Sequence, residues 1–361
     1  MTAPHLVPVR AARISGDDHA DRGRARGQLL ADGIRATVDG YARLFAELGI
    51  PEDVQLAASA ASLDALRAWD PDQHREVAGV AQGAGLELVD LGRTLARTEI
   101  LTRATVRPGE CSTVVHRAPG ATLSVQTWDW YAQFTGCWHA QRVEALDREL
   151  AHAGFAEYGM TGKIGLNAAG VGVHLNILRH RDDDAGGVPV HAVLARVLTH
   201  ARSVEEAVEI VRSAPTSSSS VLTLVDPDRA VMAEIAAGRV STLEQEGWGT
   251  HTNHFLAEDL QDGAMLLDPA SDSLDRLAWL DAHVGGEAPT DADDLLPVMC
   301  SPLGRKGVAL LPDPTLPERE RTATLVTVRL DPARRQVALS PGVPQHAEDA
   351  TVRYRLAPQT P

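Results

Sequence analysis

Cys111 is the residue of this sequence with the clearest capacity for chemistry. It stands in the stretch RPGECSTVV, residues 107–115, directly after a Pro-Gly turn and before a run of β-branched residues. A cysteine becomes a strong nucleophile when a nearby base accepts the thiol proton. The nearest downstream histidine, His116, lies five residues along the expected strand, where strand alternation points it to the opposite face. A local Cys/His pair is therefore disfavoured.

A different base becomes available if the chain is cut between Glu110 and Cys111. The freed α-amine would have a reference pKa of about 8, close to working pH, and would belong to the same residue as the thiol. One residue would then supply both the nucleophile and the general base. This arrangement predicts that Cys111 is a nucleophile.

A hairpin is expected to position this cysteine. The β-rich runs CSTVVHR and TLSVQTWDWY flank the turn sequence APGA, which is typical of an antiparallel hairpin. With the turn centred near Pro119, Cys111 is expected opposite Thr127, and Asp129 just beyond. The hairpin would thus bring a thiol and a carboxylate to the same end of one sheet.

The elements around the hairpin predict an α+β layered domain. Before Cys111, apolar residues at spacings of four and three indicate a helix that ends at Gly49 and Pro51, a second helical stretch ends at Pro71, and a third runs from about His74 to Leu101. After the hairpin, strands, helices and further strands follow in turn, which disfavours a parallel Rossmann sheet. The first helix face comprises Leu30, Ile34, Val38, Tyr41, Phe45 and Leu48.

Composition narrows the classes of protein. A net charge of −15 over 361 residues argues against a general nucleic-acid binder, which needs a basic surface. No stretch approaches the roughly 18 to 20 apolar residues of a membrane span, and the N-terminus lacks the apolar region of a signal peptide. Three cysteines make no even disulfide framework. We therefore expect a cytoplasmic protein that binds neither nucleic acid nor membrane.

The motifs together resemble a known family. ECSTVV, the Asp of QTWDW eighteen residues after the cysteine, GKIGLNAAGVGVHLNIL, VMAEIAAG and HTNHF are similar in order and spacing to the C45 group of autoproteolytic acyltransferases and hydrolases, within the N-terminal nucleophile hydrolase superfamily. This chain has Glu110 where the family often has Gly, and Thr127 where relatives commonly have Asn.

The resemblance implies a four-layer αββα sandwich made of two fragments. Residues 1–110 would be a helical propeptide that becomes the small subunit, and residues 111–361 the catalytic large subunit, with cleavage between Glu110 and Cys111. The fragments would stay together as one integrated domain. A homo-oligomer is left open.

The resemblance also implies roles for individual residues. Cys111 would be the nucleophile, Asp129 would position the thiol and the freed α-amine, Asn253 would donate to the oxyanion, and Arg321 is the candidate for the catalytic arginine. Neither a cofactor nor a metal is expected. The residues assigned to substrate binding are Thr127, Trp128, Trp130 and His254.

The expected reaction proceeds through an acyl-Cys111 intermediate. Its substrate would be a small molecule, an N-acyl amide or a thioester, and hydrolysis of an amide is favoured because no acceptor-binding motif is evident. Acyl transfer from coenzyme A is one alternative. A metal-dependent hydrolase that uses His251, His254 and the acidic run at residues 182–184 is a second. The third is a ligand-binding homologue that Glu110 leaves uncleaved.

Overall fold

The computed structural model describes residues 8–104, 111–304, 306–348 and 351–359. Helices dominate the part before Cys111, as predicted. The helix expected around Tyr41 is α2, and most of its predicted apolar face is buried. The helices of this part are α1 (His19–Leu29), α2 (Ala31–Glu47), α3 (Glu52–Trp69), α4 (Pro71–Ala84), α5 (Leu88–Leu95) and α6 (Arg97–Leu101).

Two features of this part differ from the prediction. The stretch expected from His74 to Leu101 is broken into α4, α5 and α6, because Gly85 adopts a left-handed conformation (φ +69°) that ends α4. The strand β1 (Ala11–Ile14) lies in a part expected to be helical, and it pairs in parallel with β4 (Trp138–Val143). This segment is a strand because it pairs with β4, and the pattern of its four residues alone could not reveal that pairing.

Two sheets hold most of the regular secondary structure after Cys111. One has eight strands in the order β1-β4-β5-β6-β7-β9-β10-β11, and the other has six in the order β12-β2-β3-β14-β15-β16 within the described ranges. A short pair, β8 and β13, lies apart from them. The remaining strands are β2 (Cys111–Arg117), β3 (Leu123–Tyr131), β5 (His152–Glu157), β6 (Ile164–Asn167), β7 (Gly172–Ile177), β8 (Arg179–His180), β9 (Ser220–Val225), β10 (Ala230–Ala236), β11 (Arg239–Glu244), β12 (Gly247–His251), β13 (Ala264–Met265), β14 (Thr322–Asp331), β15 (Gln336–Pro341) and β16 (Val352–Arg355).

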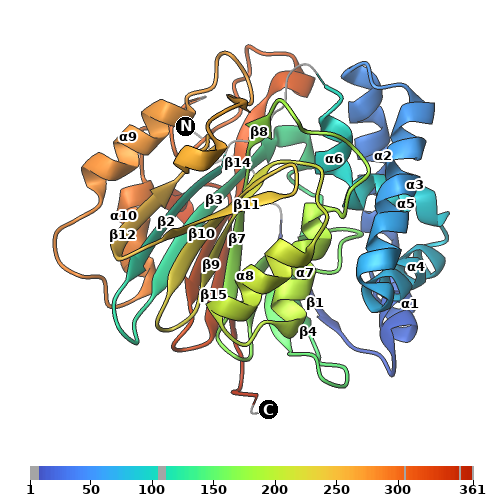
Figure 1. The fold of residues 1–361 in the computed structure, drawn as a ribbon, viewed down its shortest axis with the longest axis horizontal. Coiled ribbons are helices and arrows are strands. Elements are labelled where there is room, and N and C mark those ends of the chain that lie inside the picture. The colour runs from blue at the N-terminus through green and yellow to red at the C-terminus, as the bar shows by residue number, and fades with distance from the viewer. Residues whose placement is uncertain (1–7, 105–110, 305, 349–350, 360–361) are drawn as a thin grey trace.

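The two sheets are stacked between helices, so the predicted αββα order is confirmed. Helices α9 (Ser273–His283) and α10 (Leu296–Met299) cover the six-stranded sheet, and α7 (Val190–His200) with α8 (Val204–Ser213) cover the eight-stranded one (Figure 1). The helices that precede Cys111 stack along one side of this sandwich (Figure 1). Most buried apolar side chains lie in one continuous core.

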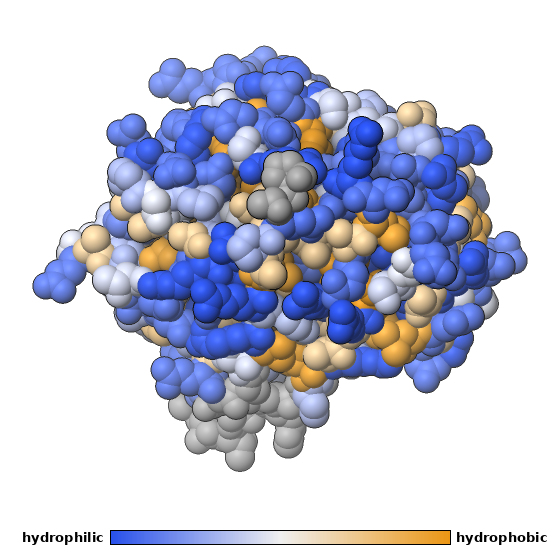
Figure 2. Space-filling model, turned by 90° about the horizontal axis from the view of Figure 1, so that it is seen from below, coloured by the Kyte–Doolittle hydropathy of each residue, from blue (hydrophilic) through white to orange (hydrophobic). Residues whose placement is uncertain are grey.

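The face of the molecule seen in Figure 2 is largely hydrophilic. Figure 2 shows one face on which apolar side chains form separate groups among hydrophilic ones. Among the described residues, no helix combines the length and the apolar character needed to cross a bilayer.

The predicted hairpin is present as β2 and β3, but its register is shifted by one residue. Cys111 pairs with Trp128 rather than with Thr127, which lies opposite Ser112. The turn is centred between Pro119 and Gly120, where Gly120 has φ +68°, and it is closed by a 3.0 Å hydrogen bond from the Ala121 amide to the Ala118 carbonyl. Because a shift of one residue reverses the face of a strand, Cys111 shares its face with Trp128.

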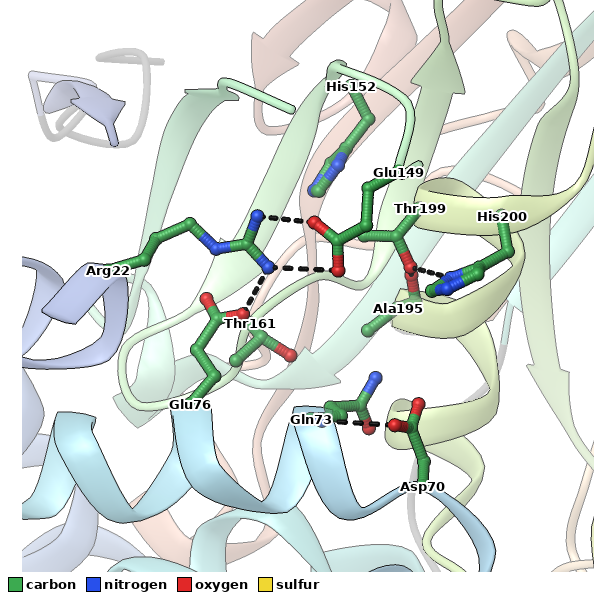
Figure 3. A pocket seen from close by; sticks show the side chains of 10 residues that line it. All are labelled: Arg22, Asp70, Gln73, Glu76, Glu149, His152, Thr161, Ala195, Thr199 and His200. Carbon is green, nitrogen blue, oxygen red and sulfur yellow. Dashed lines mark hydrogen bonds and ion pairs between the residues drawn. The ribbon is translucent and has the colours of Figure 1, made fainter. Parts of the chain in front are cut away.

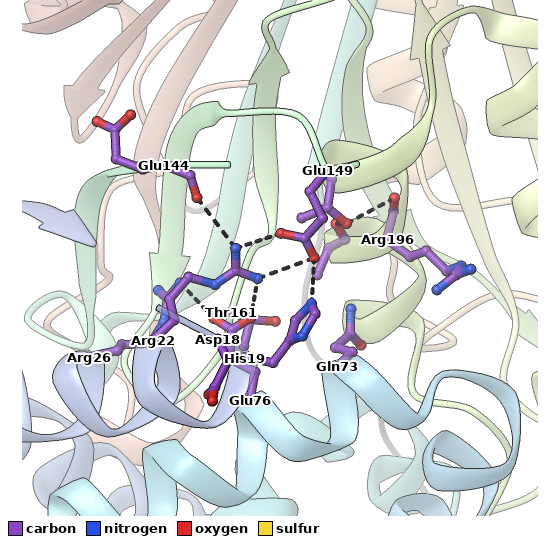
Figure 4. Close-up of polar contacts among 12 residues, drawn as sticks. Asp18, His19, Arg22, Arg26, Gln73, Glu76, Glu144, Glu149, Thr161 and Arg196 are labelled. Carbon is purple, nitrogen blue, oxygen red and sulfur yellow. Dashed lines mark hydrogen bonds and ion pairs between the residues drawn. The ribbon is translucent and has the colours of Figure 1, made fainter. Parts of the chain in front are cut away.

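Ion pairs join the helices before Cys111 to the sheets after it. Arg22 on α1 lies 2.5 Å from Glu76 on α4 and 2.5 Å from Glu149, in the loop between β4 and β5 (Figure 3). His19 also contacts Glu149, and Arg22 donates to the Glu144 carbonyl (Figure 4). Arg22, Glu76 and Glu149 are buried. Since removing one partner of a buried ion pair is strongly destabilising, these contacts hold the two parts of the chain together.

Helices α1 and α4 approach each other so closely that only glycine fits at their contact. A Cβ at Gly23 would lie 2.1 Å from the backbone oxygen of Glu76. We expect Gly23→Ala to lower the free energy of unfolding by about 1–3 kcal/mol, as overpacking does, although alanine favours a helix by about 1 kcal/mol. Urea denaturation measures the change. Gly136→Ala is the control, because a Cβ there meets open space; equal stability of the two variants would contradict this packing.

Candidate active site

Cys111 is the first residue of β2, and its main chain is held on several sides. Its amide donates to Asn253 Oδ1 (2.7 Å), and its carbonyl accepts from Asn176 Nδ2 (2.9 Å) and from an Arg276 guanidinium nitrogen (3.0 Å). The side chain is buried. The predicted nucleophile therefore has a fixed place at the end of the six-stranded sheet, whereas Glu110 lies outside the described residues.

Asn253 lies where the sequence motif predicted it, beside Cys111. It follows β12, which pairs with β2. Its Oδ1 accepts from the Cys111 amide and from Arg276 (3.0 Å), and its Nδ2 donates to the Ile177 carbonyl (2.9 Å). Because two neighbours can only donate and one can only accept, these contacts fix the orientation of the amide. Its role as an oxyanion donor stays a prediction.

Arg276 is the site residue that sequence reasoning missed. From the buried face of α9, its guanidinium donates to the Cys111 carbonyl, to Ser112 Oγ (2.9 Å) and to Asn253 Oδ1, and pairs with Asp272 (2.8 Å). The signal in the sequence was its position in the buried stripe of an amphipathic helix, where a charged residue needs partners. The other members of that stripe are Ser273 and Leu280.

Arg321, the arginine predicted from the resemblance, is oriented differently. Its guanidinium donates to the carbonyls of Leu316 (2.8 Å) and Pro314 (3.1 Å), in the loop before β14. The contacts described for Arg321 do not include Cys111. The structure thus places Arg276, and not Arg321, against the nucleophile.

Asp129 is buried near the thiol, although the shifted register and strand alternation place its side chain on the other face from Cys111. Thr127 Oγ1 lies 3.4 Å from its Oδ2. Burial, and then the negative charge of Asp129, raise the pKa of the Cys111 thiol to about 12. The Asp129 amide and the positive charges of Lys163 and Arg276 act in the opposite direction. At neutral pH the thiol of the uncut chain therefore keeps its proton.

The two tryptophans predicted to bind substrate pack against positive charges. Lys163 Nζ lies 3.5 Å from the ring centroid of Trp128, and the Arg97 guanidinium lies 4.0 Å from that of Trp130. Both distances are typical of cation–π contacts. Trp128 also packs on Phe155 of the opposite sheet, with ring centroids 5.2 Å apart, which places its face between the sheets.

The two histidines of the metal hypothesis have separate partners. His251 contacts Glu234 (2.7 Å), and His254 contacts Ser273 Oγ (2.8 Å). Burial lowers the pKa of His254 to about 4. In the part of the chain that the structure describes, no three His, Cys, Asp or Glu side chains gather as metal ligands would. The histidine pair thus offers no shared metal site here.

An apolar cleft borders the strand next to Asp129. Its volume is about 120 Å³, and one of its lining residues, Thr324, is the direct partner of Asp129 in the β3–β14 ladder. Aromatic and aliphatic side chains line much of the rest, which suits an apolar acyl group. They include Trp138, Tyr158, Leu310, Leu325 and Val343.

A second cavity lies among the ion pairs of Arg22 (Figure 3). Its volume is about 10 Å³, enough for about one water molecule and too small for a substrate. His152 lines it, and burial among the cations Arg22 and Arg26 lowers the pKa of this histidine to about 3. The cavity thus belongs to the structural contact between α1, α4 and α7.

Replacing Arg276 tests the framework of the site. Arg276→Met would remove a buried cation from four acceptors, so we expect a loss of about 3–5 kcal/mol in the free energy of unfolding, measured by urea denaturation. The control is Arg319→Met, whose exposed side chain makes one weak ion pair with Glu320; it should change stability by less than about 0.5 kcal/mol. Equal effects of the two changes would contradict the framework role.

Comparisons with known proteins agree with the motifs. The family model described as acyl-coenzyme A:6-aminopenicillanic acid acyl-transferase matches residues 117–287, a range that contains Asp129, Asn253 and Arg276. The 40 kDa form of acyl-coenzyme A:6-aminopenicillanic-acid-acyltransferase from Emericella nidulans is 26% identical over 226 residues, and the match spans 60% of each chain. The solved penicillin V acylase of Agrobacterium tumefaciens has 16% identity and a TM-score of 0.40, covering 64% of this chain and 83% of its own.

The resemblance inferred from the motifs around Cys111 is thereby confirmed. Over residues 117–287 the chain is similar to the acyl-coenzyme A:6-aminopenicillanic acid acyl-transferase family.

Proposed function

We propose that the chain is a self-processing amidohydrolase that cleaves an N-acyl amide through an acyl-Cys111 intermediate. The observation that supports this most directly is the setting of Cys111 at the start of β2, with Asn253 and Arg276 on its main chain and Asp129 beside its thiol. Acyl transfer from a thioester uses the same intermediate and differs only in the group that removes the acyl chain.

The proposed maturation is cleavage between Glu110 and Cys111. In the uncut chain the nitrogen of Cys111 is an amide that donates to Asn253 Oδ1, so it cannot accept a proton. Cleavage would turn the same nitrogen into an amine with a reference pKa of about 8. That amine would stay beside Asn253 and within the site, where it can act as general base.

The proposed reaction of the mature site has two stages. The Cys111 thiolate attacks the acyl carbonyl, the C–N bond breaks, and the α-ammonium of Cys111 gives its proton to the leaving amine. Water then attacks the thioester and releases the carboxylic acid. The cleft beside Thr324 would hold the acyl chain, because its lining is largely apolar.

Residues 1–110 would remain in place as the small subunit after cleavage. The buried ion pair of Arg22 with Glu149 crosses from this segment to the rest of the chain, and Glu76 of the same segment holds the Arg22 guanidinium in place. A separated segment would leave Glu149 buried or exposed without its main cation, which favours a lasting association of the fragments.

Intact mass tests the proposed cleavage. The purified wild-type chain should give two fragments that meet between Glu110 and Cys111, whereas Cys111→Ala should give one chain. A Cys300→Ala variant is the matched control, since this cysteine lies outside the site and its loss should leave cleavage unchanged. A wild-type chain that stays whole while it binds acyl ligands would support the uncleaved binding homologue instead.

Substitution of Asn253 tests the oxyanion assignment. Asn253→Ala should lower kcat for an N-acyl amide by about a hundredfold to a thousandfold, the usual effect of losing one oxyanion donor. Released amine measures the rate, and thermal unfolding of the same sample separates lost chemistry from lost structure. An unchanged kcat in a folded, cleaved variant would remove Asn253 from the mechanism. Supplying an acyl-coenzyme A with an amine acceptor distinguishes transfer from hydrolysis.

A further inference from the structure

A buried group of charges lies between the N-terminal helices and the sheets, near the nucleophile. Its centre is the carboxylate of Glu157, at the end of β5. Arg97 on α6 contacts it at 2.9 Å, Lys163 Nζ at 2.6 Å, and the Tyr41 hydroxyl of α2 also donates to it. All four side chains are fully buried. We refer to Glu157, Arg97, Lys163 and Tyr41 as the Glu157 cluster.

The Glu157 cluster lies on the same side of the six-stranded sheet as the thiol. Lys163 Nζ lies over the ring of Trp128, and Trp128 is the direct cross-strand partner of Cys111. Side chains of such partners point to the same face, with Cβ atoms about 4.5–5.5 Å apart. The ammonium of Lys163 therefore lies over the ring of the residue that neighbours Cys111 on the same face of the sheet, and its charge acts on the thiol.

The charges of the cluster do not balance when every group is in its usual form. One carboxylate, Glu157, faces two cations, Arg97 and Lys163, in a site without solvent. An unbalanced buried charge is costly. Burial lowers the pKa of Lys163 to about 7; Glu157 opposes this shift, and the positive charge of Arg97 adds to it. The cluster becomes neutral if Lys163 gives up its proton, or if a second anion forms nearby.

Other titratable groups face this site from every side. His191 is held neutral because burial and the cations Arg97 and Lys163 bring its pKa well below the usual value. Glu99, near Arg97, has a pKa raised to about 7 by burial. The remaining groups that face the cluster or the thiol are Cys137, Asp129 and Arg276.

We propose that Lys163 is the proton partner of Cys111, and that Arg97 and Glu157 set the balance between the two. The proton leaves Cys111 Sγ and binds the lone pair of Lys163 Nζ, so a neutral thiol and amine become a thiolate and an ammonium. No other reactant is required. This inference rests on the proposed role of Cys111 as nucleophile, and Lys163 acts through Cys111 as a positioning residue.

Lys163 would have a specific role in the uncut chain. Before cleavage the nitrogen of Cys111 is an amide and cannot take the thiol proton, so the first reaction of the chain needs a base from elsewhere. Lys163 lies in the part of the chain after Cys111, whereas Arg97 lies before it. A residue of the N-terminal segment would therefore control the protonation of a nucleophile in the other fragment.

Titration of the thiolate tests the proposal without any substrate. Ultraviolet absorbance of the thiolate, taken as the difference from Cys111→Ala, gives the apparent pKa of the thiol in each variant. Lys163→Met removes the cation, so this pKa should rise and the thiolate fraction at a fixed alkaline pH should fall about tenfold or more. Glu157→Gln removes the anion that competes with the thiolate, so the pKa should fall. Lys306→Met, at an exposed position, is the matched control and should leave it unchanged.

The rate of self-cleavage supplies a second readout. Lys163→Arg keeps the positive charge but cannot release a proton near neutral pH, so it should keep the thiolate within about threefold of wild type and slow cleavage about tenfold or more. If Lys163→Met does not fold, two results still decide: the lower thiol pKa expected for Glu157→Gln, and slowed cleavage at a nearly unchanged thiolate fraction in Lys163→Arg.

The outcomes separate this proposal from the proposed function. Shifts of opposite sign for Lys163→Met and Glu157→Gln support the proton partnership. Titrations that match the Lys306→Met control would overturn it, even if Cys111→Ala abolishes cleavage and the nucleophile assignment stands. Cleavage that persists in Cys111→Ala would refute the proposed maturation, while the thiolate titrations would still measure the coupling to Lys163.

Discussion

The carboxylate of Glu157 is the contact on which the arrangement of this protein depends. It is fully buried and receives a hydrogen bond or an ion pair from two N-terminal helices and from the loop after β5. A charge in such a place is tolerated only when its partners are held at good geometry. The positions of α2, α6 and the eight-stranded sheet are therefore linked, and the aromatic rings beside Cys111 are packed against the same cations.

A second constraint acts on the other side of the nucleophile. Arg276 reaches from α9 to the Cys111 carbonyl and to Asn253, so the outer helix layer and the loop after β12 meet at one main-chain group. Cys111 thus lies between two sets of buried positive charge, one on each face of its sheet. The thiol is nevertheless protonated in the uncut chain, because burial and Asp129 outweigh these cations. The reactivity of the Cys111 thiol therefore depends on its protonation state and not only on which residues lie near it.

Local pattern predicted much of this structure from the sequence. The face of α2, the hairpin around Pro119 and the alternation of strands and helices are all properties of short segments, and they appear in the structure. The register of the hairpin was predicted wrongly, because it depends on whether the turn is centred on Pro119 or between Pro119 and Gly120. The composition of the turn does not encode this difference of half a residue. The prediction missed strand β1 because its partner, β4, lies more than a hundred residues away in the sequence.

The predicted residues that lie beside Cys111 are those that belong to recognisable motifs. Asp129 and Asn253 lie in recognisable motifs and are found beside Cys111. Arg276 lies in no recognised motif, and its contacts follow from a helix that packs on β2. Arg321 was predicted instead because the resemblance implied an arginine near the C-terminal strands. Lys163 stood inside a quoted motif, yet its significance depends on Glu157 and Arg97, which only the folded chain brings to it.

The buried bridges across the two parts of the chain also govern how it can be assembled. While the chain is whole, Arg22 meets Glu149 and Arg97 meets Glu157 in a unimolecular search, and the local concentration of each partner is fixed by the connecting chain. A break after residue 110 would leave those contacts intact but make their formation bimolecular. The cut protein would then unfold as before and refold only as fast as two fragments can find each other, so its recovery from denaturation would depend on dilution.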